Sequence, residues 1–163
     1  MRKRIEPGPG QESVWDYPRP PKIDPTDKLV RVEFNGVRIA ETRRAIRVLE
    51  TSHPPAYYIP REDVKTEFLT QTSRRTFCEF KGQATYWTIK VGDQTSENAG
   101  WSYESPASRY AAIEGYLTFY PSRVDACYVD DERVQPQEGD FYGGWITSDI
   151  VGPFKGGPGT WGW

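Results

Sequence analysis

The chain of 163 residues is long enough for one domain with a buried core, and its 15 glycines and 14 prolines favour turns and short strands over long helices. A net charge of −2 excludes a global positive field, so we expect no nucleic-acid partner. No apolar run approaches the roughly 18 residues of a membrane span, and no apolar stretch follows the charged N-terminus, so we expect a cytoplasmic protein without membrane contact or secretory signal.

Residues 1–27 form a tail rich in proline, glycine and charge, with Trp15 among its few apolar anchors. We expect Trp15 to dock the Pro-rich segment 15–21 onto the domain as an extended strap. The alternative is that this segment is a ligand for an SH3-type domain, because repeated prolines favour the polyproline II conformation. The domain proper then occupies residues 28–138.

The first predicted elements of this domain are a β-hairpin and a strand. Leu29–Phe34 alternates apolar and polar residues with period two, Asn35-Gly36 follows, and Val37–Glu41 resumes the pattern. Asn-Gly between two such runs predicts a hairpin with a type I′ turn. Ala45–Glu50 is short and β-branched, which predicts a strand that leads into the next segment.

The segment Glu50–Val64 holds the single histidine of the chain, His53, together with three prolines and paired tyrosines. Proline fixes φ and removes an N–H donor, so the backbone conformation around His53 is restricted. Such a restricted backbone suits a side chain that must be oriented toward a specific contact. Pro60, followed by two acidic residues, predicts a short helix at about residues 61–69.

The second half of the chain combines strands with one longer helix. Aromatic and β-branched residues predict strands at 76–80, 85–91, 94–98, 100–104 and 126–130. Ser105-Pro106 supplies a cap and a first-turn proline, and apolar residues recur at helical spacing after it, which predicts the main helix at about 106–119. Glycine and aromatic residues alternate in the extension, residues 139–163, which predicts little regular structure. The fold class is α+β, with small, mostly antiparallel sheets.

Several motifs together resemble a known family, the domain of unknown function 427, which is also labelled nucleotidyltransferase family 9. The motifs are Glu50-Thr-Ser-His-Pro-Pro55, Tyr57–Val64, Cys78–Trp87, Trp101–Pro106 and Tyr116–Tyr120. They fall in the family's order and spacing over about residues 28–135. The resemblance implies a compact, bacterial, β-tent-like domain, a fold shared with zinc-binding exchange-factor-like proteins and methionine sulfoxide reductase B.

The nucleotidyltransferase label implies carboxylates that hold paired metal ions beside a Gly-Ser turn. The chain has no Gly-Ser followed by Asp-x-Asp, and Asp130 and Asp131 are adjacent, so in a strand their carboxylates face opposite sides. The zinc sites of β-tent relatives use two CxxC pairs, which Cys78 and Cys127 do not form. We therefore expect no metal site, and the sequence indicates no particular cofactor.

His53 and Glu50 are the candidates for catalysis. An imidazole titrates near physiological pH, so His53 can act as an acid, a base or a ligand donor. Glu50 can orient His53 or serve as a base itself. The alternative for His53 is a histidine that only caps a turn, and for Glu50 a salt bridge that ties the loop down.

Three charged residues are candidates for binding an anionic or polar ligand. Lys81 precedes Gly82 between two strands, where glycine allows a phosphate or carboxylate to approach the lysine closely. Arg61 can hold an anion with two hydrogen bonds, and Glu104 follows a strand end that the resemblance places near the mouth of the domain. The alternatives are a solvated turn lysine and a structural salt-bridge network.

Aromatic residues supply the predicted walls of the pocket. Adjacent residues of a strand face opposite sides, so one member of Tyr57-Tyr58 and one of Tyr86-Trp87 packs in the core while the other lines a surface. We assign Tyr58, Tyr86 and Trp101 to the pocket, where aromatic rings stack on a base or another planar ligand.

These candidates predict a pocket that binds a small anionic or planar ligand, with nucleotide-like compounds included, and leave open whether the ligand is turned over. The alternative is a protein- or peptide-binding module that acts through its Pro-rich and aromatic-rich tails, residues 1–27 and 139–163. The same aromatic tails are the candidate contacts for a homo-oligomer.

Overall fold

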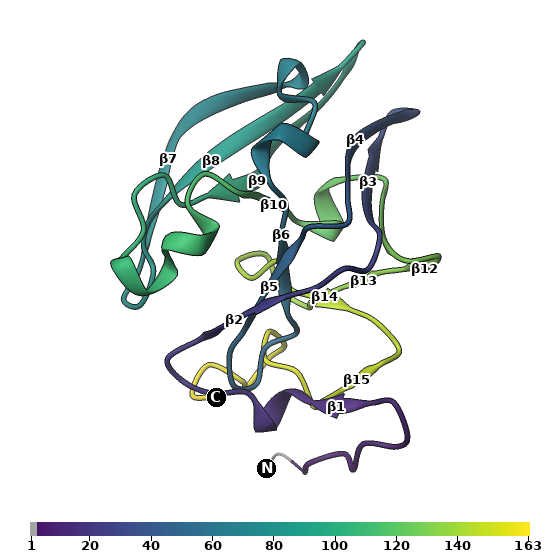
Figure 1. Ribbon diagram of the computed structural model, residues 1–163, viewed down its shortest axis with the longest axis vertical. Helices are drawn as coiled ribbons and strands as arrows, with labels where there is room; N and C mark the ends of the chain where they lie inside the picture. The colour runs from purple at the N-terminus through teal and green to yellow at the C-terminus, as the bar shows by residue number, and fades with distance from the viewer. Residues whose placement is uncertain (1–2) are drawn as a thin grey trace.

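The computed structural model describes residues 3–163, so the first two positions of the predicted N-terminal tail lie outside it. Its architecture is mostly antiparallel β-sheet, and the helical segments of the described chain are short 3₁₀ turns. None of the described helices is long and apolar enough to cross a membrane. The N-terminal and C-terminal segments lie together at one end of the molecule, below the sheets in Figure 1.

The first sheet has four antiparallel strands and fills the upper left of Figure 1. Its strands in spatial order are β10 (Leu117–Phe119), β9 (Gln94–Ser102), β8 (Gly82–Val91) and β7 (Leu69–Cys78). Gly92 and Asp93 join β8 to β9, and Gly92 adopts a φ of +61° that a larger side chain would oppose. The strands predicted at 94–98 and 100–104 are one strand, β9, which ends at Ser102.

The second sheet also has four antiparallel strands. They are β12 (Glu132–Arg133), β11 (Ala126–Val129), β3 (Val30–Phe34) and β4 (Val37–Thr42) in spatial order. The predicted hairpin is confirmed, because Asn35 and Gly36 join β3 to β4 with φ values of 46° and 77°. Positive φ at both central residues is the signature of a type I′ turn.

Three smaller pairings complete the fold. A three-stranded sheet contains β2 (Lys22–Pro25), β5 (Ile46–Leu49) and β6 (Ala56–Tyr58). Two-stranded pairings join β13 (Gln135–Pro136) to β14 (Trp145–Ile146), and β1 (Glu12–Ser13) in parallel to β15 (Ile150–Val151). The last pairing places the N-terminal segment directly on the C-terminal extension.

Neither predicted helix forms. The 3₁₀ turns are η1 (Val14–Asp16), η2 (Arg61–Asp63), η3 (Thr66–Phe68), η4 (Ser108–Ile113) and η5 (Pro121–Arg123). In place of the main helix at 106–119, η4 is followed by Gly115 at φ +74°, and the chain then enters β10. The apolar spacing predicted one helix face packed on one core, and this prediction is wrong because Ile113 and Leu117 pack into two different apolar clusters.

The short helix predicted at 61–69 is replaced by η2 and η3, and β7 begins at Leu69. Between the two turns, Val64 forms a β-bridge with Ala40, and the amide of Lys65 donates to the carbonyl of Ile39 at 2.8 Å. A tertiary pairing with β4 therefore outweighs the local helix signals.

Three apolar clusters form the interior of the described chain, and adjacent residues of β6 divide between the first two. Tyr57 belongs to the first cluster, which lies among both four-stranded sheets, whereas Tyr58 belongs to the second, which is rich in tyrosine. Tyr86 and Trp87 divide in the same way. This confirms the predicted alternation and places one aromatic residue of each pair beside the cavity described below.

Candidate functional site

A cavity of about 480 Å³ lies beside the second apolar cluster. Its lining includes the floor of β8 and β9, the end of the β7–β8 hairpin, the histidine segment (residues 50–64) and the C-terminal extension, and Arg19 and Val48 add to it. Six predicted site residues line this cavity, namely Glu50, His53, Tyr58, Lys81, Tyr86 and Trp101.

Lys81 is placed in the cavity by the tight end of the β7–β8 hairpin. Cys78 pairs with Gly82 across the strands, and the Lys81 carbonyl accepts a hydrogen bond from the amide of Ala107 at 2.9 Å. The residue is only 8% exposed, and its Nζ lies 5.6 Å from the ring centre of Tyr103. No carboxylate of the described residues lies within ion-pair distance of Lys81.

His53 is held by contacts on both ring nitrogens and one ring face. Its Nδ1 lies 3.4 Å from Nε2 of Gln137, and its Nε2 lies 3.9 Å from Oε2 of Glu50. Its ring packs edge-on against the Tyr142 ring, with 4.7 Å between the two ring centres. The Gln137 amide N–H donates to Nδ1, which assigns the imidazole proton to Nε2. His53 can therefore present an N–H to the cavity.

Burial, together with the positive charges of Lys155, Arg19 and Lys81, lowers the pKa of His53 to about 3. The expectation that His53 titrates near physiological pH is thus wrong, because the sequence showed neither its burial nor these three cations. At neutral pH the imidazole is uncharged and donates a hydrogen bond without taking up a proton.

Glu50 faces Arg19 more closely than it faces His53. Its Oε2 lies 3.3 Å from Nε of Arg19, and its side chain is 22% exposed. Arg19 also donates to the carbonyls of Thr51 at 2.8 Å and Trp163 at 3.3 Å. The Arg19 charge is therefore balanced by Glu50, and the pair joins the N-terminal segment to the histidine segment.

Tyrosine and tryptophan side chains form the floor of the cavity. The Trp101 indole N–H donates to the hydroxyl of Tyr58 at 3.2 Å, and the Tyr86 hydroxyl lies 2.9 Å from Oγ1 of Thr76. Burial raises the pKa of Tyr103, so its phenol stays protonated, and among the described residues its hydroxyl has no hydrogen-bond partner. The Tyr103 hydroxyl is thus a free donor beside Lys81.

Arg61 and Glu104 do not line the cavity. They form an ion pair with each other at 2.6 Å, and the Arg61 Nε donates to the carbonyl of Gly115 at 3.0 Å. The Arg61 guanidinium also lies over the Trp87 ring, 5.1 Å from its centre, and Ser102 donates to Glu104 at 2.6 Å. Arg61 and Glu104 thus form the structural salt-bridge network that the sequence analysis gave as the alternative to ligand binding.

Several cavity residues belong to segments that the sequence did not connect with the site. They are Arg19 from the N-terminal segment, Gln137, and Tyr142, Lys155 and Trp161 from the extension. One local signal was available: Lys155 precedes two glycines, as Lys81 precedes Gly82.

Two glycines let the extension approach the cavity floor. A Cβ on Gly143 would lie 2.5 Å from the Trp101 ring, and a Cβ on Gly144 would lie 2.5 Å from Oε1 of Gln137. The amide of Gly144 donates to that same oxygen at 3.0 Å. Any larger residue here would push the extension off Trp101, which explains why the loop needs this Gly-Gly pair.

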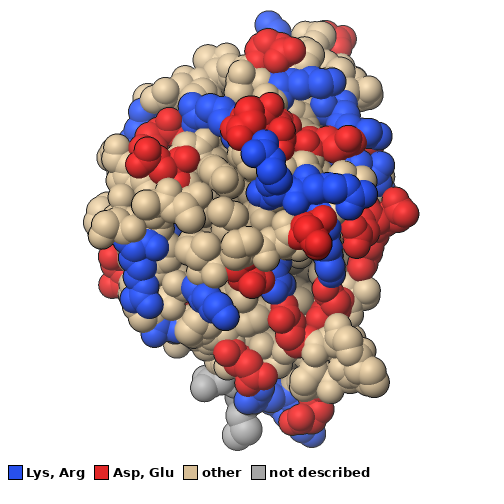
Figure 2. Space-filling model, viewed as in Figure 1, with Lys and Arg blue, Asp and Glu red and all other residues tan. Residues whose placement is uncertain are grey.

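The described residues contain no cluster of three or more His, Cys, Asp or Glu side chains that could hold a metal ion. Basic and acidic side chains are interspersed on the face that Figure 2 shows, so that face carries no extended patch of one sign.

Comparisons with known proteins identify the central part of the chain. A family model described as Domain of unknown function (DUF427) matches residues 22–130. Comparison with curated proteins gives no significant match. The matched residues include the histidine segment, Lys81 and the cavity floor, but the C-terminal extension lies outside them.

Proposed function

The chain belongs to the DUF427 family, and from the geometry of its cavity we propose that it binds a small anionic, planar ligand, with nucleotide-like compounds as one class to test. The family description assigns no activity, so the proposal rests on the residues of the cavity. A volume of about 480 Å³ is within the range of small-molecule sites.

The observation that carries the proposal is the environment of Lys81. Lysine side chains usually extend into solvent, and those held largely in a protein interior are paired or hydrogen-bonded as a rule. Lys81 is 8% exposed and no acidic side chain of the described residues pairs with it. An anionic group on a ligand would supply the missing partner, with the Tyr103 hydroxyl and the His53 N–H as neighbouring donors.

The aromatic floor supports a planar ligand. Tyr58, Tyr86 and Trp101 line the cavity, and each is at most 8% exposed, so a ligand would meet aromatic atoms at the cavity wall. A neutral His53 cannot take up a proton at neutral pH, so the arrangement supports binding better than acid–base catalysis. Catalysis by His53 and Glu50 stays a prediction.

Three further points belong to the proposal. The two four-stranded antiparallel sheets support the β-tent arrangement that the family resemblance implies. We propose the division into residues 1–27, 28–138 and 139–163 as tail, domain and extension. We also propose a cytoplasmic location.

A thermal-shift screen tests the proposal directly. The panel contains nucleotides, sugar phosphates, aromatic carboxylates and tetrapyrroles, applied to the wild type, Lys81→Met and Lys90→Met. Lys90 is an exposed lysine at the far end of β8 and serves as the matched control. A compound at 100 times its Kd adds about 2.7 kcal/mol of stability.

We expect at least one anionic, planar compound to stabilise the wild type and Lys90→Met but not Lys81→Met. The proposal fails if no compound of this class stabilises the wild type, or if Lys81→Met responds as fully as the control.

A second function, binding of a protein or a second copy of the chain, is favoured by exposed aromatic residues in the extension. Trp161 is 75% exposed and Phe141 is 46% exposed. Under this alternative, Trp161→Ala and Phe141→Ala prevent the capture of a partner protein, or prevent the formation of a dimer measured by sedimentation. Lys81→Met has no effect on either. A monomer with no captured partner excludes it.

A further inference from the structure

The C-terminal extension contributes a second unpaired cation to the cavity. Lys155 lines the cavity, and it lies outside residues 22–130, which the family model matches. Among the described residues, Lys155 has no carboxylate within ion-pair distance, as is also true of Lys81. The third nearby cation, Arg19, is already paired with Glu50.

The backbone of Lys155 is fixed beside the histidine segment. Its amide donates to the carbonyl of Ser52 at 2.8 Å, and its carbonyl accepts from Nε2 of Gln137 at 2.7 Å. The same Gln137 nitrogen lies against His53. The backbone of Lys155 is therefore held by Ser52 and by Gln137, and Gln137 also contacts His53.

The side chain of Lys155 also faces His53. Its Nζ lies 5.4 Å from the ring centre of Tyr142, whose ring contacts the imidazole. Lys155 and Lys81 are both close enough to His53 for their charges to lower its pKa. Both lysines thus lie near the imidazole of His53. Their positive charges repel each other, and negative charge bound between them would offset this repulsion.

We propose, on the basis of the proposed function, that Lys155 makes the cavity a site for a planar ligand with two negative charges, one balanced by Lys81 and the other by Lys155. Three exposed aromatic residues at the cavity, Phe77, Phe141 and Trp161, would cover the part of a planar body that extends beyond it. In this chain the extension selects dianionic over monoanionic ligands.

Three probes with the same planar body test this selection. They are 2-naphthoate, with one charge, and 2,6-naphthalenedicarboxylate and 2-naphthyl phosphate, each with two. Affinities are measured by titration calorimetry at pH 7.5 for the wild type, Lys81→Met, Lys155→Met and the control Lys90→Met. Thermal unfolding of each variant without probe confirms that it is folded.

For the wild type and the control, we expect at least one dianion to bind about tenfold more tightly than 2-naphthoate, because a charge-assisted contact is worth about 1.4 kcal/mol or more. Lys155→Met should reduce this ratio to about twofold while 2-naphthoate still binds. Lys81→Met should weaken all three probes. Which dianion is preferred tells whether the two charges lie apart or on one phosphate.

Equal affinities for all three probes, or an unchanged ratio in Lys155→Met, overturn this inference and leave the proposed function intact. No binding of any probe to the wild type overturns both.

Discussion

Lys81 carries its charge in a place where the described fold gives it no acidic partner. It is nine-tenths buried between the Tyr103 ring and the hairpin end. Structural lysines normally keep their ammonium group in water, because removal from water costs several kcal/mol unless a partner replaces the solvent. A group that costs stability in this way is typical of a binding site, where a ligand supplies the partner.

The burial of His53 predicts that the stability of the fold depends on pH. Its folded pKa of about 3 lies below the value of about 6.5 in an unfolded chain, so below pH 6.5 the unfolded state binds more protons than the folded state. Stability therefore falls by about 1.4 kcal/mol per pH unit as pH drops below 6.5. The loss continues until the folded pKa is reached.

Urea unfolding at pH 5.0 to 6.5 measures this effect before most carboxylates titrate. His53 is the single histidine of the chain, so His53→Gln should flatten the profile in this window. A wild-type profile that is already flat would show that the imidazole is not buried as the structure has it.

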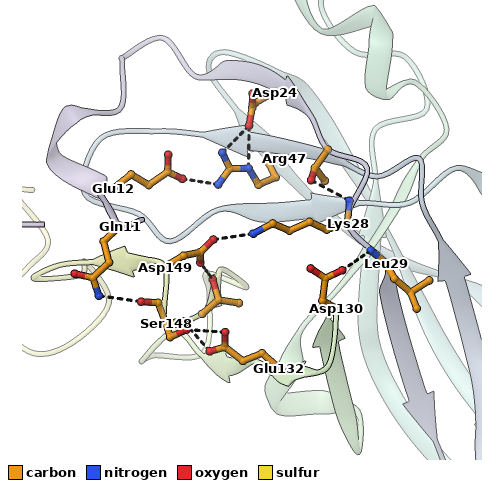
Figure 3. Close-up of polar contacts among 12 residues, drawn as sticks. Gln11, Glu12, Asp24, Lys28, Leu29, Arg47, Asp130, Glu132, Ser148 and Asp149 are labelled. Atoms are coloured by element: carbon orange, nitrogen blue, oxygen red, sulfur yellow. Dashed lines mark hydrogen bonds and ion pairs between the residues drawn. The ribbon is translucent and has the colours of Figure 1, made fainter. Parts of the chain in front are cut away.

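An ion-pair network ties the N-terminal segment to strand β5. In Figure 3, Arg47 reaches Glu12 on one side and Asp24 of β2 on the other, both at 2.6 Å. Nearby, Lys28 donates to Asp149 at 3.0 Å, which links the start of the domain to the extension. Burial opposes the Asp149 charge, but hydrogen bonds from Thr147 and Lys28 outweigh it and lower the pKa of that carboxyl.

Replacing Arg47 should weaken this attachment. The Arg47 side chain is 15% exposed, and Arg47→Met leaves two half-buried carboxylates without their partner, so we expect a loss of about 2 kcal/mol in urea unfolding. The control is Arg44→Met, because Arg44 pairs with Glu62 and Asp63 at the surface and such pairs contribute about 0.5 kcal/mol. Equal losses in the two variants would refute a special role for the network.

Elements with strong local signals could be predicted from the sequence, whereas elements decided by distant contacts could not. The Asn35-Gly36 hairpin needs only its turn residues and alternation, and it forms as predicted. The helix at 106–119 was wrong because apolar spacing does not tell which core each residue enters, and Ile113 and Leu117 enter different ones. Helix propensity is a weak prior that tertiary packing overrides.

At the scale of the whole molecule, the C-terminal extension is part of the core. Trp145 is fully buried, its ring stacks on Tyr57 at 5.0 Å, and its indole N–H donates to the carbonyl of Phe119 at 2.9 Å. The N-terminal segment is docked in turn, because Val14 packs with Ile150 and the Trp15 indole donates to Pro153 at 2.8 Å. Trp15 thus contacts the extension through Pro153 and the Trp163 ring, whereas the sequence predicted that it docks on the domain.

Two tryptophans of the extension should therefore respond differently to substitution. Trp145→Ala should lower the free energy of unfolding by about 3–5 kcal/mol, because it removes a large buried side chain and leaves a cavity. Trp161→Ala should change it by less than about 0.5 kcal/mol, because Trp161 is 75% exposed. Comparable losses, measured by urea unfolding, would contradict the packing of the extension.

The site could be predicted only where one chain segment carries its own signal. His53 beside prolines and Lys81 beside a glycine indicated the cavity, and the alternation of strand residues indicated Tyr58. Lys155 and Arg19 reach the cavity from opposite ends of the chain, so only the folded structure brings them together. Arg61 and Glu104 show the converse, since oppositely charged residues in promising motifs pair with each other.

The stability of Lys81→Met without any ligand shows whether Lys81 serves ligand binding or the fold. Urea unfolding at pH 7.5 compares it with the wild type and Lys90→Met. We predict that Lys81→Met is as stable as the wild type or more stable by up to about 2 kcal/mol, because an apolar side chain of similar length replaces a largely buried lysine that has no acidic partner. A loss of more than about 1 kcal/mol relative to the control would show that Lys81 stabilises the fold and would contradict its role as a ligand-binding residue.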